Sequence, residues 1–177
     1  MDYENPNLVT MFVTRDPLSR ALAGDGTTSK YFPNIFRYNN GTRKEWERFA
    51  RGPATNNYAL RILSNEYCCQ QNNTDRKYLE MAKALVKRFT FVLDIDCLDH
   101  GLAAIANILG FEISRNIQAA DSNPRHHHLP VKERVPFPDV YEFMRDGNKL
   151  GIELHEWAKS RALVDCSTVQ SDRRRDT

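Results

Sequence analysis

The chain lacks the long apolar runs and the charge imbalance that mark membrane-spanning and nucleic-acid-binding proteins. It has 177 residues, and its longest run rich in apolar residues, 101–111, is interrupted by Asn107. A transmembrane helix needs roughly 20 apolar residues. Lys and Arg number 25 against 23 Asp and Glu, and the one basic run, 173–175, lies in a polar tail. We therefore expect no membrane span and no nucleic-acid partner.

Signals for export and for a defined disulfide framework are also sparse. The first residues have neither the positive segment nor the apolar segment of a signal peptide, so a secretory protein would need a targeting segment or anchor outside this sequence. If all 4 cysteines are oxidised, three pairings remain open. The cysteines are Cys68, Cys69, Cys97 and Cys166.

The spacing of apolar residues predicts an α/β fold, in which helices alternate with a few strands. Residues 7–14 read as a buried strand that leads into a helix with Pro17 in its first turn. A helix at 74–88, a strand at 89–95 and a helix that begins after Asp96 and ends at Gly110 follow in the second half. Further helices are expected after the capping-box pattern at 42–45 and at 57–64, 138–146 and 149–163, with loops at 24–29 and 116–136.

The junction between the first strand and its helix is the most informative stretch. In parallel α/β sheets, ligands bind outside the carboxyl ends of the strands, where a helix N-terminus favours an anion. Arg15 lies at this point and can grip a phosphate with two hydrogen bonds, while the hydroxyl of Ser19 is one turn further along. The alternative is that Arg15 pairs with Asp16 or another carboxylate and only ends the strand.

Four motifs in this sequence resemble, in the same order, those of sulfotransferases that use 3′-phosphoadenylyl sulfate, above all the membrane-bound carbohydrate sulfotransferases. Residues 15–23 are similar to the family's 3′-phosphate motif Arg-x-Pro-x-x-Arg-x-x-Ser, with Ala23 in place of the final Ser. Residues 57–63 resemble its Asn-Tyr-x-x-Arg-x-Leu segment, and residues 82–110 its helix–strand–helix block. Residues 148–158 resemble Asn-x-Leu-Asp-x-Glu-Leu-Tyr-x-x-Ala, with Gly151 and His155 replacing the Asp and the Tyr.

The resemblance implies a partial P-loop-NTPase-like parallel sheet with flanking helices and a helix-rich C-terminal portion. It implies that Arg15 and Ser19 bind 3′-phosphoadenylyl sulfate, that Asn57 and Arg61 bind the substrate, and that no metal takes part. The other partner would be a carbohydrate acceptor, and the compartment the Golgi lumen. The family's phosphosulfate loop and the residue that takes the acceptor proton lie upstream of the 3′-phosphate motif. We therefore expect residues 1–166 to be the C-terminal part of a catalytic domain, truncated or naturally short, and residues 167–177 to be a disordered tail.

Three other features have both an ordinary and a functional interpretation. The three histidines at 126–128 are consecutive, so their side chains diverge, and we interpret them as a solvated loop that could face an anionic sugar rather than as a zinc site. The adjacent Cys68 and Cys69 fit core thiols or a structural disulfide better than a nucleophile. We interpret His155 as a packing histidine rather than a catalytic base.

The leading hypothesis is transfer of a sulfuryl group from 3′-phosphoadenylyl sulfate to a sugar hydroxyl. The second is a non-catalytic sulfotransferase-like module that binds glycan or nucleotide. A third is a different phosphate-binding enzyme that uses residues 24–30, although this stretch follows a helix and lacks the spacing of a phosphate loop.

Overall fold

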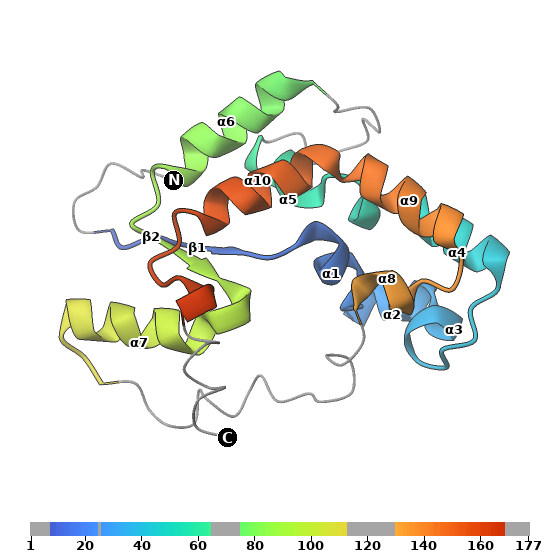
Figure 1. Ribbon diagram of the computed structural model, residues 1–177, viewed down its shortest axis with the longest axis horizontal. Helices are drawn as coiled ribbons and strands as arrows, with labels where there is room; N and C mark the ends of the chain where they lie inside the picture. Colours follow the sequence, from blue (N-terminus) through green and yellow to red (C-terminus); the bar gives the residue numbers. More distant parts are fainter. Residues whose placement is uncertain (1–7, 25, 65–74, 113–129, 169–177) are drawn as a thin grey trace. The chain divides into compact units, whose positions relative to one another are not determined.

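The computed structural model describes residues 8–24, 26–64, 75–112 and 130–168. The chain divides into two compact units, which we describe separately. The strand unit consists of Met1–Arg15, Lys83–Asn123 and His155–Thr177, and the helical unit of Asp16–Ala82 and Pro124–Leu154. Most of the described elements are helices, and the strands are parallel, so the coarse α/β class is confirmed (Figure 1). No helix in the described ranges is both long and apolar enough to cross a membrane.

The strand unit is built on a parallel pair of strands. β1 (Met11–Thr14) and β2 (Phe91–Asp94) pair in register, so that Thr14 lies beside Asp94 at the carboxyl ends. Both strands lie where the sequence predicts them but are shorter than predicted. β1 is only partly buried, because Val9, Met11 and Val13 are exposed while Thr14 is buried. The prediction of a fully buried first strand is therefore wrong.

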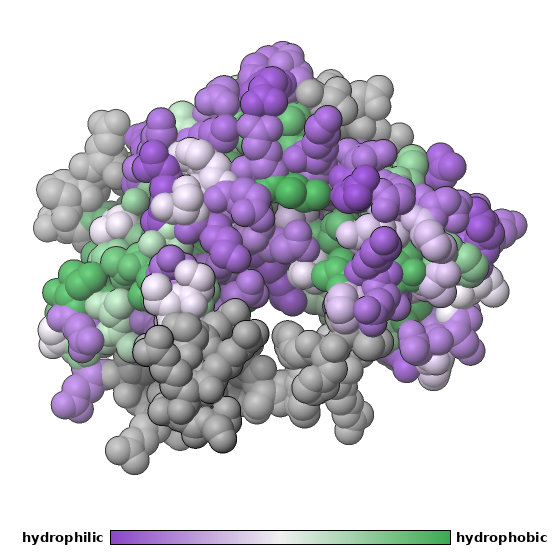
Figure 2. All heavy atoms as spheres, in the orientation of Figure 1, coloured by the Kyte–Doolittle hydropathy of each residue, from purple (hydrophilic) through white to green (hydrophobic). Residues whose placement is uncertain are grey.

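Helix α7 (Leu98–Leu109) covers β2 through a close approach at Gly101. A Cβ at this position would lie 2.8 Å from Cδ2 of Leu93, so a larger residue would push the helix away from the strand. The helix ends at Gly110 with φ of 73°, as predicted. Apolar residues near this end, including Ile108 and Leu109, are exposed. Figure 2 shows a green area over α7 at the left of the view.

The predicted N-terminal cap of α7 is wrong. A short 3₁₀ helix, η2 (Ile95–Cys97), is inserted between β2 and α7, and the N-cap residue of α7 is Cys97, without a side-chain cap. Oδ1 of Asp94 accepts a hydrogen bond of 3.1 Å from the N–H of Asp96 and so caps η2. The extra turn moves the first helical residue past Asp96, which leaves that carboxylate at the surface.

A disulfide between Cys97 and Cys166 closes the strand unit. It joins the start of α7 to the segment that follows α10 (Lys149–Lys159), and so selects one of the pairings that the sequence left open. In the same segment, the N–H of Leu163 donates to the carbonyl of Val92 over 2.8 Å. The chain after α10 is thus joined to the start of α7 by a covalent bond and to β2 by a hydrogen bond. Cys68 and Cys69 lie outside the described residues.

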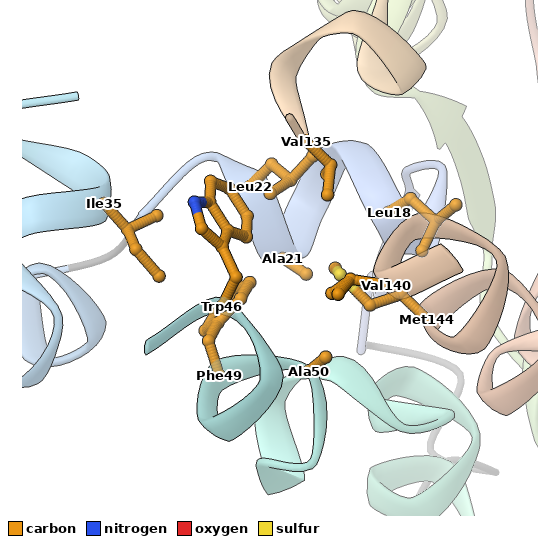
Figure 3. Packing of buried hydrophobic residues seen from close by; sticks show 10 residues of the cluster. All are labelled: Leu18, Ala21, Leu22, Ile35, Trp46, Phe49, Ala50, Val135, Val140 and Met144. Carbon is orange, nitrogen blue, oxygen red and sulfur yellow. The ribbon is translucent and has the colours of Figure 1, made fainter. Parts of the chain in front are cut away.

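The helical unit has an aromatic and aliphatic core (Figure 3). The ring of Phe49 is its centre and meets the rings of Phe32, Phe36 and Trp46 edge-on, at centroid distances of 5.4, 5.2 and 5.9 Å. The helices that lie wholly within this unit are α1 (Pro17–Leu22), α2 (Gly26–Tyr31), α3 (Pro33–Phe36), α4 (Arg43–Ala50), η1 (Pro53–Thr55), α5 (Tyr58–Leu63), α8 (Val131–Arg134) and α9 (Pro138–Gly147). Helices α6 (Arg76–Val86) and α10 contribute residues to both units.

The loop predicted at residues 24–29 is largely helical. Gly24, with φ of 67°, makes the turn after α1, and α2 then begins at Gly26. The N–H of Phe32 donates to the carbonyl of Thr28 over 3.0 Å, which leads α2 directly into α3. Composition alone misled the prediction, because a glycine and hydroxyl-rich stretch can be helical when neighbouring helices hold it. Residues 113–129 and 169–177, which include the histidine run and most of the predicted tail, lie outside the described residues.

The capping box of α4 is confirmed. Oγ1 of Thr42 accepts from the N–H of Glu45, and Oε2 of Glu45 accepts from the N–H of Thr42 over 2.8 Å. Hydrogen bonds from the backbone N–H and then the hydroxyl of Thr42, and from the side chain of Asn34, lower the pKa of Glu45. Two donors that the helix itself cannot satisfy are thereby paired.

We predict that Thr42→Ala lowers the free energy of unfolding by about 1 kcal/mol, because it removes the side-chain half of the cap. The comparison is urea unfolding followed by circular dichroism. Lys44→Ala, at an exposed position of the same helix, is the control and should change stability by less than about 0.5 kcal/mol. Equal stability of Thr42→Ala and the wild type would contradict the capping role.

We predict that the double variant Cys97→Ala/Cys166→Ala is less stable than the wild type by about 2–4 kcal/mol, because the cross-link restricts the unfolded chain. Peptide mapping of the unreduced wild type should recover the Cys97 and Cys166 peptides joined. Alkylation of both residues without prior reduction would show that the bond is absent.

Candidate functional site at the carboxyl end of the sheet

The carboxyl ends of the two strands carry a buried polar pair. Thr14 and Asp94 end β1 and β2 side by side, and both are buried. Strand ends of this kind are where parallel α/β sheets bind their ligands. Polar side chains buried there need partners, because an unpaired buried polar group is costly. The partners come from α10.

His155 on α10 is the partner of Thr14. Its Nδ1 lies 2.9 Å from Oγ1 of Thr14, and the ring is buried. The hydrogen bond fixes the side chain at the end of β1 from a residue far away in sequence. A buried, hydrogen-bonded ring is what the packing interpretation of His155 describes, and this geometry gives no support to the alternative of a catalytic base.

Lys159 is the partner of Asp94. The side chain of Asp94 is 1% exposed, and its Oδ2 has no hydrogen-bond partner among the described residues. The ammonium nitrogen of Lys159 lies 3.5 Å from that oxygen. A buried carboxylate needs a nearby opposite charge to offset its loss of hydration, and Lys159 supplies it.

Around Lys159 the site reaches the surface. Its side chain is 41% exposed, and its Nζ is 4.0 Å from Oδ2 of Asp96, whose side chain is 57% exposed. The pKa of Asp165 is lowered, chiefly by hydrogen bonds from the backbone N–H and hydroxyl of Ser167, with a smaller contribution from the charge of Lys159. One ammonium thus lies within 4.0 Å of two carboxylates, those of Asp94 and Asp96.

Arg15 directly follows Thr14 and is half-buried. Within the described part of the strand unit it makes no hydrogen bond or ion pair. The sequence alternative, in which Arg15 pairs with Asp16, has less support, since Oδ1 of Asp16 accepts the N–H of Ser19 over 2.6 Å. Arg15 is thus the predicted cofactor residue that stands at the strand ends.

Ser19 belongs to the helical unit, and it is described there by itself. Asp16 caps α1, because its side chain accepts the backbone N–H of Ser19. This amide at the helix N-terminus is therefore not available to an anion, and phosphate binding by the Ser19 hydroxyl stays a prediction. The second arginine of the motif, Arg20, donates to the carbonyl of Ala54 and lies 3.9 Å from the centre of the Tyr58 ring. These contacts give Arg20 a structural role.

The predicted substrate residues Asn57 and Arg61 are buried in the helical unit. Asn57 has φ of 42°, and its Oδ1 accepts from the N–H of Gly151 over 2.7 Å. Arg61 donates from Nε to the carbonyl of Asn56 over 3.0 Å and from its terminal nitrogen to that of Pro53. These partners hold the chain around η1 and α5 in place, and substrate binding by Asn57 and Arg61 remains a prediction.

Asn148 completes this network. Its Oδ1 accepts from the N–H of Asn57 over 3.0 Å, and its Nδ2 donates to the carbonyls of Thr55 and, over 2.8 Å, Met144. A Cβ at Gly151 would lie 3.2 Å from Oδ1 of Asn57, so the small residue there fits the close approach. Asn148 and Gly151 both fall within the fourth motif of the resemblance.

A hollow lies in the helical unit, between α4 and α9. It is open, has a volume of about 200 Å³, and is lined by Glu47, Ala50, Arg51, Asp139, Val140 and Phe143. None of the predicted site residues lines it. Across the described residues, no group of three or more His, Cys, Asp or Glu side chains is placed to hold a metal ion.

Comparison with protein-family models, with curated proteins and with solved structures finds no match for this chain. The site must therefore be interpreted from its own geometry. Sequence reasoning placed Arg15 at the strand ends but missed Thr14, Asp94, Asp96 and Lys159. One feature of the sequence could have indicated Asp94 as a site residue: it is the single charged residue of the strand at 91–94, Phe-Val-Leu-Asp, and it lies at the end of that strand.

We predict that Asn148→Ala lowers the free energy of unfolding by about 2–3 kcal/mol, because it leaves buried backbone groups without partners. Lys149→Ala, the exposed neighbour, is the matched control and should be nearly neutral. The measurement is urea unfolding at neutral pH. A loss equal to that of the control would show that the network carries little of the stability.

Proposed function

We propose that this chain is a relative of the carbohydrate sulfotransferases and that Arg15 binds the 3′-phosphate of 3′-phosphoadenylyl sulfate. The observation that carries the proposal is the position of Arg15, one residue past the carboxyl end of β1 in a parallel pair of strands. The finer fold assignment, a partial P-loop-NTPase-like sheet, is part of the same proposal.

The state of Arg15 supports an anionic ligand. Its guanidinium is half-buried and makes no ion pair with the described residues of its unit, so its donors are available. A guanidinium can give a phosphate two parallel hydrogen bonds. Thr14, next to it, is fixed by His155, so the backbone that carries Arg15 is held in one place.

The donor supplies the activated sulfuryl group, which an in-line displacement would transfer to a sugar hydroxyl. The bond between sulfur and the phosphate oxygen of the donor would break as the hydroxyl oxygen bonds to sulfur, and a base would take the hydroxyl proton. In this scheme Arg15 orients the donor by its 3′-phosphate, which is a positioning role. The residue that acts as base is not assigned.

The disulfide supports the compartment that we propose, the Golgi lumen. Disulfides persist in oxidising compartments and are rare in the cytosol. The Cys97–Cys166 bond joins buried sulfurs, so it fits a structural cross-link of a protein from the secretory pathway. A carbohydrate acceptor would be available to an enzyme there.

A non-catalytic module that binds nucleotide or glycan is the second candidate. Ala23, where the family has a Ser, is the C-cap residue of α1 and offers no hydroxyl. The third hypothesis used residues 24–30 as a phosphate loop, but most of this stretch belongs to helix α2 (26–31), which follows another helix. This arrangement argues against a phosphate cradle at residues 24–30 and leaves the sulfuryl end of the donor without an assigned partner.

We predict that Arg15→Ala weakens binding of adenosine 3′,5′-bisphosphate by about 1.5–3 kcal/mol, or roughly 10- to 100-fold, the size of a hydrogen bond to a charged group. Calorimetry on the full chain measures the effect. Arg145→Ala is the control, because Arg145 is exposed and pairs only with Glu142 among the described residues. Equal affinities of Arg15→Ala and wild type would refute the assignment.

Transfer of labelled sulfate to desulfated glycosaminoglycans separates the two candidates. Turnover that Arg15→Ala reduces supports the enzyme. If the chain binds the bisphosphate without turnover, the assay is repeated with a chain extended upstream: turnover then supports the enzyme, and its continued absence supports the non-catalytic module. Turnover unaffected by Arg15→Ala would contradict the role of Arg15 in either form.

A further inference from the structure

Lys159 and Asp96 form a wide ion pair at the surface of the strand unit. Their charged atoms are 4.0 Å apart, beyond the 2.7–3.2 Å of a direct hydrogen bond. A hydroxyl beside the pair, at hydrogen-bond distance from each charged atom, can accept a hydrogen bond from the ammonium and donate one to the carboxylate. Both side chains reach solvent, so a ligand can approach them.

The charge around Lys159 favours a neutral hydroxyl over an anion. The ammonium already offsets the buried Asp94, and the exposed carboxylate of Asp96 lies 4.0 Å from it. A further anion would meet an excess of carboxylates, whereas a hydroxyl donates to a carboxylate without adding charge. The proposed binding residue for an anion is instead Arg15, which follows the neighbouring strand β1.

The two side chains sit on segments that are fixed to each other. Asp96 lies in η2, between the end of β2 and Cys97, and Lys159 ends α10, whose following segment contains Cys166. The disulfide joins these segments. The ion pair with the buried Asp94 restricts the position of the Lys159 ammonium. A binding pair held in this way loses little freedom when a ligand binds.

We propose that Asp96 and Lys159 form a hydroxyl-binding pair for a sugar ring at the carboxyl end of β2, with Asp94 as the residue that positions Lys159. The inference rests on the proposed function, because it places the sugar beside the strand end that carries Arg15. Two sources share this chemistry: the ribose of the nucleotide donor and the sugar of the acceptor. In both cases the pair accepts and donates hydrogen bonds and takes no part in a covalent step.

The experiment compares Asp96→Ala and Lys159→Met with the wild-type full chain by calorimetry. The probes are adenosine 3′,5′-bisphosphate, its 2′-deoxy analogue and a desulfated chondroitin oligosaccharide. Asp99→Ala and Lys87→Met, which remove the same charges from exposed positions of the strand unit, are the matched controls. Thermal unfolding checks that each variant is folded. If Lys159→Met is not, the double variant Asp94→Asn/Lys159→Met, which also removes the buried charge, replaces it.

If the pair binds ribose, both variants should bind the bisphosphate about tenfold more weakly and lose the preference for it over the deoxy analogue. If the pair binds the acceptor, both should lose oligosaccharide binding about tenfold while bisphosphate binding is unchanged. The controls should resemble the wild type in either case.

Failure of this inference differs from failure of the proposed function. Wild-type affinity of both variants for every probe, together with weaker bisphosphate binding by Arg15→Ala, would overturn the hydroxyl-binding pair and leave the role of Arg15 intact. Normal bisphosphate binding by Arg15→Ala would overturn the proposed function, whatever the pair does. A wild type that binds none of the probes would overturn both.

Discussion

The carboxylate of Asp94 is buried at the end of β2, and much of the strand unit is arranged to compensate for its charge. Lys159 has to reach it from α10, which requires the C-terminal part of that helix to lie against the strand ends. The same placement brings His155, one turn earlier, to Thr14. The disulfide and the bond from Leu163 to Val92 then fasten the end of this segment. Removing the partner of such a carboxylate would leave an uncompensated buried charge.

In the helical unit, buried polar groups are paired by neutral side chains rather than by an ion pair. Asn57 in a left-handed conformation and Asn148 between two helices would each leave polar groups unpaired, and they satisfy one another together with Thr55 and Gly151. Three of these positions fall in the segments that carry the family resemblance. The contacts of Asn57 and Arg61 give both residues a role in folding, and substrate binding by them stays a prediction.

Local signals in the sequence predicted the elements that depend on local interactions. The capping box of Thr42 and Glu45, the glycine that ends α7 and the proline that begins α1 each act within one turn, and all three are confirmed. The 3₁₀ turn after β2 was not predicted, because Asp94 both ends the strand and caps the turn. The helix at 26–31 was not predicted, because its glycine and hydroxyl residues are more typical of loops. Of the candidate site, the sequence predicted Arg15, because it follows a recognisable strand. It did not predict the pair of Lys159 and Asp94, because these residues are 65 positions apart in sequence.

The account's central claim is that a ligand binds at the carboxyl end of the parallel strands. Backbone amide chemical shifts of the isotope-labelled full chain, recorded while adenosine 3′,5′-bisphosphate is added, test it most directly. We expect the largest changes at Thr14, Arg15 and the residues of η2, which follow the two strands. Changes centred instead on the hollow between α4 and α9, or no change at the strand ends at saturating nucleotide, would contradict the claim.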